Sequence, residues 1–157
     1  MLYRLMHDDV EVASFEVDTS SGAIVGKVSV QDLDHMPLST VVKGQFVDTA
    51  RFKEWWFGRS IPSSRSDIRC FFDSLDVPNN APLLIRSLAL SLSDHYWVKP
   101  AGSNLTWSDV NYFDNAFSDD VGDILFGNPV QEGSIDFSSP DITSEGNLKK
   151  RWRIIDG

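Results

Sequence analysis

The chain has 157 residues, a length typical of one domain, and 41% of them are hydrophobic, which is enough to bury a core. Its formal net charge of −9 argues against general nucleic-acid binding, because phosphates would be repelled, and favours basic protein partners. The single cysteine, Cys70, excludes an internal disulfide and suits a reducing cytoplasm. Without an export signal or an apolar run of about 20 residues, we expect a cytoplasmic protein with no membrane partner.

The first third of the chain has the pattern of β-strands. Apolar residues alternate over residues 10–17, and the parity changes between Val12 and Ala13, which predicts a β-bulge. A turn-forming run at 18–22 is followed by apolar residues at every second position from Ile24 to Val30. These two segments predict an antiparallel hairpin.

The middle of the chain has the pattern of short helices. Asp48 or Thr49 is placed to cap a first helix that buries Phe52, Trp55 and Trp56. A second helix, capped by Ser63 or Ser64, has the i, i+3, i+4, i+7 spacing of an amphipathic helix at Ile68, Phe71, Phe72 and Leu75. A third is expected from Asn80 to about Leu90, buried on most sides.

Shorter elements follow. Residues 96–98 predict a strand that Pro100 ends. Thr106 and Asp109 have the spacing of a capping box, and the acidic run 118–120 suits the first turn of a last short helix. Together these elements predict an α+β fold with a central cluster of short helices.

The last 30 residues differ from the rest. Ile135 and Phe137 predict a strand, a loop rich in serine and glycine covers 138–147, and residues 151–154 alternate as a second strand. Asp156-Gly157 is a strong hairpin signal with no returning strand after it. We interpret this as a chain cut from a longer protein, or one to which a partner adds a strand.

No complete catalytic or metal site is expected. His7, His35 and His95 are not spaced as metal ligands, and Cys70 lies between apolar helix positions as a structural thiol does. The acidic residues Asp114, Asp119, Asp120 and Asp123 suggest a cation site, but they lack the periodicity of a calcium loop and also fit a solvated helix start.

Two segments have the composition of binding sites. Arg59 and Arg65 flank a proline turn, so they either bind an anion with their guanidinium groups or tie helix ends and carboxylates together. The loop from Ser138 to Gly146, between two predicted strands, has the arrangement of a kinase loop that covers nucleotide phosphates, although it holds one glycine.

Several runs in order resemble one family. The runs are WWFGRSIPSSR at 55–65, LSLSDHYWVKP at 90–100, the segment 107–127 with DVNYF and FSDDVGD, and SPD at 139–141 through WRIIDG at 152–157. Together they resemble the N-terminal part of bacterial HipA-like serine/threonine kinases, in the branch common in Gram-positive bacteria. The resemblance covers nearly the whole chain.

The resemblance implies two regions, a HipA-like N-terminal α+β domain at 1–128 and the start of a truncated kinase N-lobe at 129–157. In that family the loop serines can be autophosphorylated, so Ser138, Ser139, Thr143 and Ser144, with Gly146, are the phosphate-loop candidates. The kinase lysine, catalytic aspartate and asparagine, which act with ATP and Mg²⁺, would follow Gly157. We therefore expect no catalytic residue and no cofactor in this chain.

The resulting hypothesis is a non-catalytic regulatory module, related to toxin–antitoxin or phage systems, that binds a HipA-like kinase core. A strand-paired homodimer is a further expectation. Two alternatives stay open: the front fragment of an active ATP-dependent kinase, and a phage-type, excisionase-like DNA adaptor in which Arg59 and Arg65 touch phosphate. The acidic charge disfavours the second.

Overall fold

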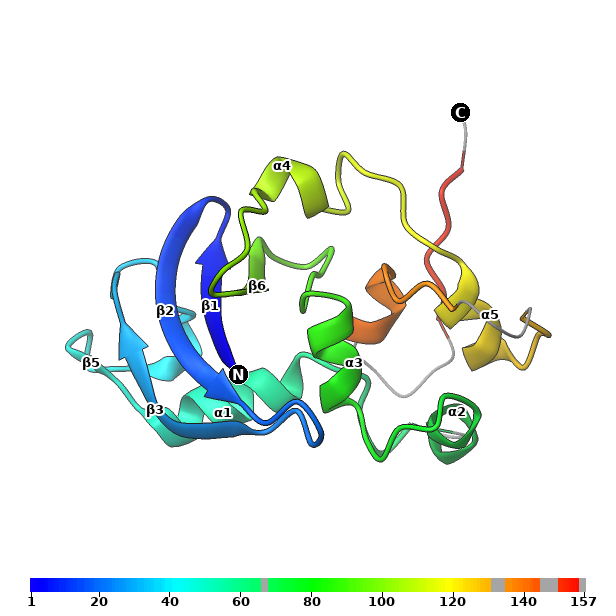
Figure 1. Cartoon of the computed structure of the whole chain (residues 1–157), viewed down its shortest axis with the longest axis horizontal. Coiled ribbons are helices and arrows are strands. Elements are labelled where there is room, and N and C mark those ends of the chain that lie inside the picture. Colours follow the sequence, from blue (N-terminus) through cyan, green and yellow to red (C-terminus); the bar gives the residue numbers. More distant parts are fainter. Residues whose placement is uncertain (66–67, 131–134, 145–149, 156–157) are drawn as a thin grey trace.

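A four-stranded antiparallel sheet forms one side of the molecule, and most of the short helices form the other (Figure 1). The computed structural model describes residues 1–65, 68–130, 135–144 and 150–155. The strand order is β3–β2–β1–β6, and every neighbouring pair is antiparallel. The strands are β1 (Leu2–His7), β2 (Val10–Val17), β3 (Ile24–Val30) and β6 (Tyr96–Pro100).

The predicted bulge and hairpin are both confirmed. Leu5 pairs with Ala13 but Met6 pairs with Glu11, so Val12 is the extra residue of the bulge. This lets Val12 and Ala13 both be fully buried although they are adjacent, which explains the parity change. β2 then pairs with β3 across the turn at 18–22.

Strand β1 lies inside the sheet, between β2 and β6, but the sequence pattern did not indicate it. Its buried residues are Tyr3, Leu5 and Met6, so the alternation breaks after Leu5, where β1 meets the bulge of β2. The burial pattern of β1 is therefore explained only by its pairing with β2.

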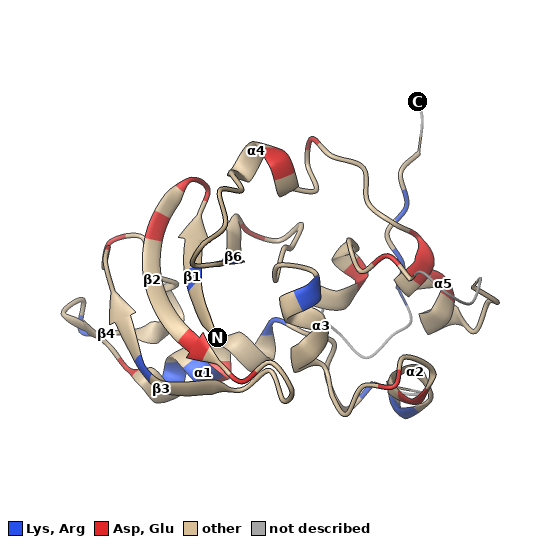
Figure 2. Cartoon of the chain, viewed as in Figure 1, with Lys and Arg blue, Asp and Glu red and all other residues tan. Residues whose placement is uncertain are grey.

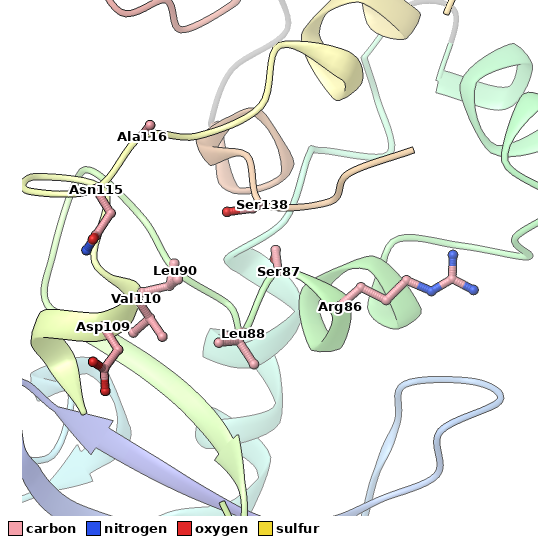
Figure 3. A pocket seen from close by; sticks show the side chains of 9 residues that line it. All are labelled: Arg86, Ser87, Leu88, Leu90, Asp109, Val110, Asn115, Ala116 and Ser138. Atoms are coloured by element: carbon pink, nitrogen blue, oxygen red, sulfur yellow. The ribbon is translucent and has the colours of Figure 1, made fainter. Parts of the chain in front are cut away.

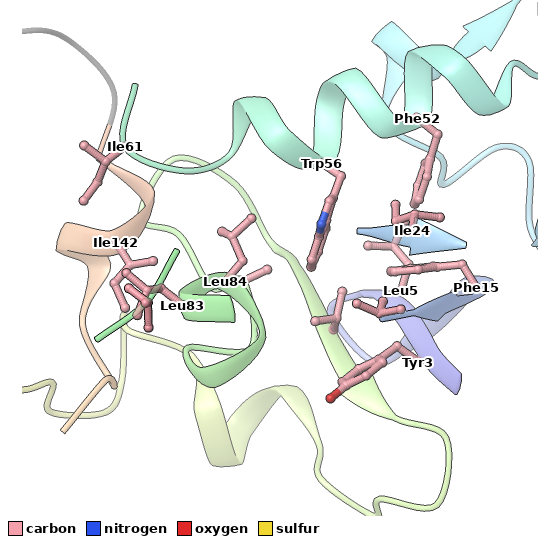
Figure 4. Close-up of a cluster of buried hydrophobic side chains, with 14 of the residues drawn as sticks. Tyr3, Leu5, Phe15, Ile24, Phe52, Trp56, Ile61, Leu83, Leu84 and Ile142 are labelled. Atoms are coloured by element: carbon pink, nitrogen blue, oxygen red, sulfur yellow. The ribbon is translucent and has the colours of Figure 1, made fainter. Parts of the chain in front are cut away.

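Helix α1 (Thr49–Gly58) is confirmed, and it packs across the sheet. The Asp48 side chain caps it by accepting hydrogen bonds from the first-turn amides. Phe52 and Trp56 are fully buried and meet Phe15 of β2 edge-on, at 5.2 and 5.7 Å between ring centroids (Figure 4). Trp56 also donates its indole N–H to the Gly22 carbonyl at 3.1 Å, which joins the helix to the hairpin turn.

The remaining elements are short. The predicted capping box of Thr106 and Asp109 is confirmed. The third helix ends at Arg86 instead of about Leu90, because Leu88 and Ala89 adopt left-handed backbone angles, with φ of +55° and +51°. These elements are α2 (Ile68–Ser74), α3 (Ala81–Arg86), α4 (Trp107–Val110), α5 (Asp120–Phe126), η1 (Leu38–Thr40), β4 (Val41–Val42), β5 (Phe46–Val47) and η2 (Pro140–Thr143).

The two strands predicted in the last 30 residues are wrong. Residues 135–139 and 150–155 have no strand, and the 3-10 helix η2 lies in the loop between them. The Ser139 side chain caps η2, and Pro140 occupies its first turn, so the backbone coils where a phosphate loop was expected. Gly146 and Asp156-Gly157 lie outside the described residues.

One hydrophobic core connects the sheet with the helices and with η2. Its largest cluster runs from Tyr3 and Leu5 on β1 through Phe52 on α1 to Ile142 on η2 (Figure 4). A second, smaller cluster contains Met6, Leu90, Trp97 and Tyr112. The α+β fold with an antiparallel sheet and a few short helices is confirmed. Among the described residues, the helices are all too short or too polar to cross a lipid bilayer.

Candidate functional site

Arg59, at the end of α1, binds protein groups with its guanidinium. Its two terminal nitrogens donate to the carboxylate of Asp94 at 2.7 and 3.0 Å, and one of them also donates to the carbonyls of Ala89 and Tyr96. The side chain is 6% exposed, and its guanidinium carbon lies 4.9 Å from the centroid of the Trp55 ring. Arg59 thereby fixes the left-handed turn after α3 to the start of β6.

Arg65 is buried beside Asp141 of η2. Burial lowers the pKa of Arg65, and the Asp141 charge acts in the opposite direction. Burial also raises the pKa of Asp141, whose carboxylate accepts hydrogen bonds from the Trp152 amide at 3.1 Å and from the Ser139 hydroxyl at 3.2 Å. Arg65 donates at 3.4 Å to the Lys150 carbonyl. These contacts hold residues 150–152 against the helices.

Arg151 adds an ion pair on the surface of α5. It donates to Asp123 at 2.6 Å and lies 3.6 Å from Asp119. Figure 2 shows acidic ribbon on α5 and basic ribbon on the C-terminal segment. Two residues of the predicted acidic cluster are thus partners of an arginine, at the start of α5 as the helix-start interpretation requires. A hydrogen bond from Asn128 and the Arg151 charge both hold the pKa of Asp123 below its usual value.

The phosphate-loop candidates separate into buried and exposed residues. Ser139, Thr143 and Ser144 are buried, and their hydroxyls bond to protein groups: Thr143 donates to the Leu90 carbonyl at 2.9 Å, and Ser144 accepts from the Trp152 indole at 3.0 Å. Ser138 is exposed and lines a hollow of about 180 Å³ (Figure 3). The structure does not bring the four together on one open surface.

A polar groove runs beside the buried part of this loop. Two hollows of about 190 Å³ each share Ser91, Ser93 and Thr143 as lining residues. Trp55 and Arg59 line the first, whereas Trp152 lines the second. The groove is therefore lined by residues of the first, second and last runs that carry the family resemblance.

Residues 151–155, which we call the C-terminal arm, are extended and carry exposed apolar side chains. Trp152, Ile154 and Ile155 are 44%, 54% and 86% exposed. The backbone groups of residues 153–155 make no hydrogen bond to another described residue. The arm therefore has both apolar side chains and backbone donors and acceptors available to a partner.

One cluster was not predicted from the sequence, because its members are far apart in the chain. His7, His35 and His95 lie together at one end of the sheet, with ring centroids 5.6 Å apart for His7 and His35 and 6.3 Å apart for His7 and His95. Only the pairing of β1 with β6 brings two of them together, and no local spacing reports it. Cys70 was expected to be at least partly buried but is exposed on α2.

The described residues thus form the C-terminal arm and two groups of contacts that we call the clamp, namely Arg59 with Asp94, and Arg65 and Asp141 with residues 150–152. Comparison of the sequence with protein-family models, curated proteins and solved structures finds no match.

Proposed function

We propose that this chain is a non-catalytic interaction module of a HipA-like serine/threonine kinase, and that it docks on the kinase core through the C-terminal arm. One contrast carries the proposal: η2 is buried in the core, whereas Trp152, Ile154 and Ile155 a few residues later are exposed. Exposed apolar side chains beside backbone groups that pair with no other described residue favour addition to a strand of another protein.

The charge of the arm supports a partner with an acidic surface. Arg151 and Arg153 lie on the arm and Lys150 directly precedes it, in a chain whose net charge is −9. Arg151 pairs with Asp123 through a hydrogen bond, whereas Arg153 acts on the same carboxylate through its charge, so we expect Arg153 to contribute more than Arg151 to orienting a partner. Such charges mainly set the association rate and the register of docking.

The residues of the clamp belong to the runs that carry the resemblance. Arg59 and Arg65 come from the first run, Asp94 from the second, and Asp141 and Trp152 from the last. Asp141 and Arg65 contact Trp152 and Lys150 and so hold the start of the arm, and the resemblance and these contacts therefore favour the same surface. The proposed role is to position or restrain the core, which would supply the groups that hold ATP and Mg²⁺.

The two alternatives fare differently. The alternative of a front fragment of an active kinase rests on the same resemblance, and the assay below distinguishes it from the proposal. The DNA adaptor required Arg59 and Arg65 to touch phosphate, and these side chains are 7% and 3% exposed. No observation favours that adaptor.

The test is co-expression of the chain with the reading frame downstream of it, followed by a pull-down and an assay of phosphate transfer from ATP. The arm variant is Ile154→Asp/Ile155→Asp. The matched control is Phe46→Asp/Leu38→Asp, because these side chains are 53% and 90% exposed, against 54% and 86% in the arm.

We expect the wild type and the control to retain the encoded kinase core, and the arm variant to lose it. Phosphate transfer by the chain alone would favour the active-kinase alternative and contradict the proposal. Equal retention of the arm variant would also contradict it. A homodimer that the arm variant abolishes, without retention of the core, would replace the kinase core by a second copy as the partner.

A further inference from the structure

Three imidazoles that are distant in the sequence gather on one surface. His7 is the last residue of β1, His35 lies in the loop after β3, and His95 directly precedes β6. These are all the histidines of the chain. His35 and His95 are each about half exposed, so solvent reaches the cluster.

Carboxylates hold two of the rings through one ring nitrogen. His35 Nδ1 lies 2.9 Å from Asp32 Oδ2, and His95 Nδ1 lies 2.8 Å from Asp8 Oδ1. Histidines that bind metals almost always engage their second ring nitrogen in this way, because the carboxylate fixes the tautomer and makes the ligand more basic. In both residues Nε2 is left as the ligand atom.

Tyr96 fixes His7 and His35 relative to each other. The His7 ring stacks on the Tyr96 ring at 4.6 Å between centroids and 27° between planes. The Tyr96 hydroxyl donates to the His35 carbonyl at 2.9 Å. Since both histidines are held before any ligand arrives, binding would order few side chains.

We propose that His7 and His35 chelate a divalent first-row transition ion such as Zn²⁺, with water in the remaining positions. With metal–nitrogen bonds of about 2.0 Å, two ligating imidazoles have centroids roughly 4.5–6.4 Å apart, depending on the angle at the metal. The observed 5.6 Å falls in this range. Imidazole favours Zn²⁺, Cu²⁺ and Ni²⁺ over Mg²⁺ and Ca²⁺.

His95 is left outside the chelate. Its ring stacks on Trp107 and meets Phe113 edge-on, each at 5.2 Å. Its centroid lies 6.3 Å from that of His7, at the upper end of the range, where the two ligands would have to be almost opposite each other instead of tetrahedral around the metal. Among the described residues, no three His, Cys, Asp or Glu side chains are placed to hold one ion. The site therefore has two protein ligands.

The test is calorimetric titration of the untagged chain with ZnCl₂ and, separately, MgCl₂. The titrations use a Cys70→Ser background, because the exposed thiol is itself a zinc ligand. We expect one Zn²⁺ per chain and no Mg²⁺. His7→Ala and His35→Ala should each weaken Zn²⁺ binding by about tenfold or more, and Asp32→Asn by about tenfold.

His95→Ala is the matched control and should change the affinity by less than about threefold, since its ring belongs to the same cluster but not to the chelate. Circular dichroism checks that each variant is folded, and His7→Gln and His35→Gln replace any alanine variant that is not. Absence of Zn²⁺ binding, or equal losses in the His95 and His7 variants, would overturn the proposal.

Discussion

Replacement of Asp94 by alanine tests whether the Arg59 clamp stabilises the fold. Asp94 accepts two hydrogen bonds from the Arg59 guanidinium and one from the Tyr96 amide. Without this carboxylate, a guanidinium that is 6% exposed keeps only the carbonyls of Ala89 and Tyr96. A buried charge without its counter-charge is strongly destabilising, because desolvation is no longer offset.

The expected loss follows from the exposure of the pair. Removing one partner of a fully buried ion pair costs about 3–5 kcal/mol. Asp94 is 34% exposed, so water screens part of the interaction, and we expect about 2–3 kcal/mol for Asp94→Ala. Asp94→Asn keeps one acceptor and should cost about 1 kcal/mol. With a urea dependence of about 2 kcal/mol per molar, the alanine variant should unfold about 1–1.5 M earlier.

Urea unfolding at pH 7, followed by circular dichroism, measures both variants. Glu54→Ala, at an exposed position of α1, is the control and should stay within about 0.5 kcal/mol of the wild type. In an Arg59→Met background, Asp94→Ala should cost about 1 kcal/mol less than in the wild type. The reasoning is refuted if Asp94→Ala is as stable as the control, or if its cost does not depend on Arg59.

The structure also predicts the direction of the stability change for substitutions at two glycines and two aspartates. A Cβ at Gly122 of α5 would lie 2.8 Å from Asp141 Oδ2, so Gly122→Ala should cost about 1–3 kcal/mol in urea unfolding. Gly58→Ala at the end of α1 meets nothing within 4 Å and should not destabilise the protein. Hydrogen bonds from Ser20 lower the pKa of Asp18 to about 2, so its contribution to stability is present above the usual aspartate pKa and is lost as the pH falls toward 2. The stability difference between the wild type and Asp18→Asn should therefore disappear over that range. At Asp141 the sign reverses, because burial raises its pKa: stability is gained as the pH falls through the folded-state value, and Asp141→Asn should lose that gain.

Local signals in the sequence predicted the elements that depend on neighbouring residues. Asp48 as a helix cap, the capping box of Thr106 and Asp109, and the bulge at Val12 each follow from a few adjacent side chains. Elements that depend on residues far away in the chain could not be predicted in this way. The burial pattern of strand β1 depends on the bulge in β2. Residues 140–143 form no strand, because Ile142 packs in the hydrophobic core instead.

The candidate site was predictable in its residues but not in its contacts. Arg59 was predicted from the sequence. Its carboxylate partner Asp94 was not, because the two meet only when the turn after α3 lies against the end of α1. The sequence also could not indicate that Ser138 is exposed and Ser139 is buried, because both are small polar residues in one loop. The imidazole cluster required the pairing of β1 with β6, a long-range contact without a local signature.

Burial of Ile142 in the main cluster has a consequence for synthesis of the protein. On the ribosome the sheet and α1 emerge before η2, so the core stays open at the position that Ile142 occupies until η2 has left the ribosome. Nascent chains that have not yet exposed η2 should therefore be sensitive to proteases, and resistance should arise when η2 closes over the helices.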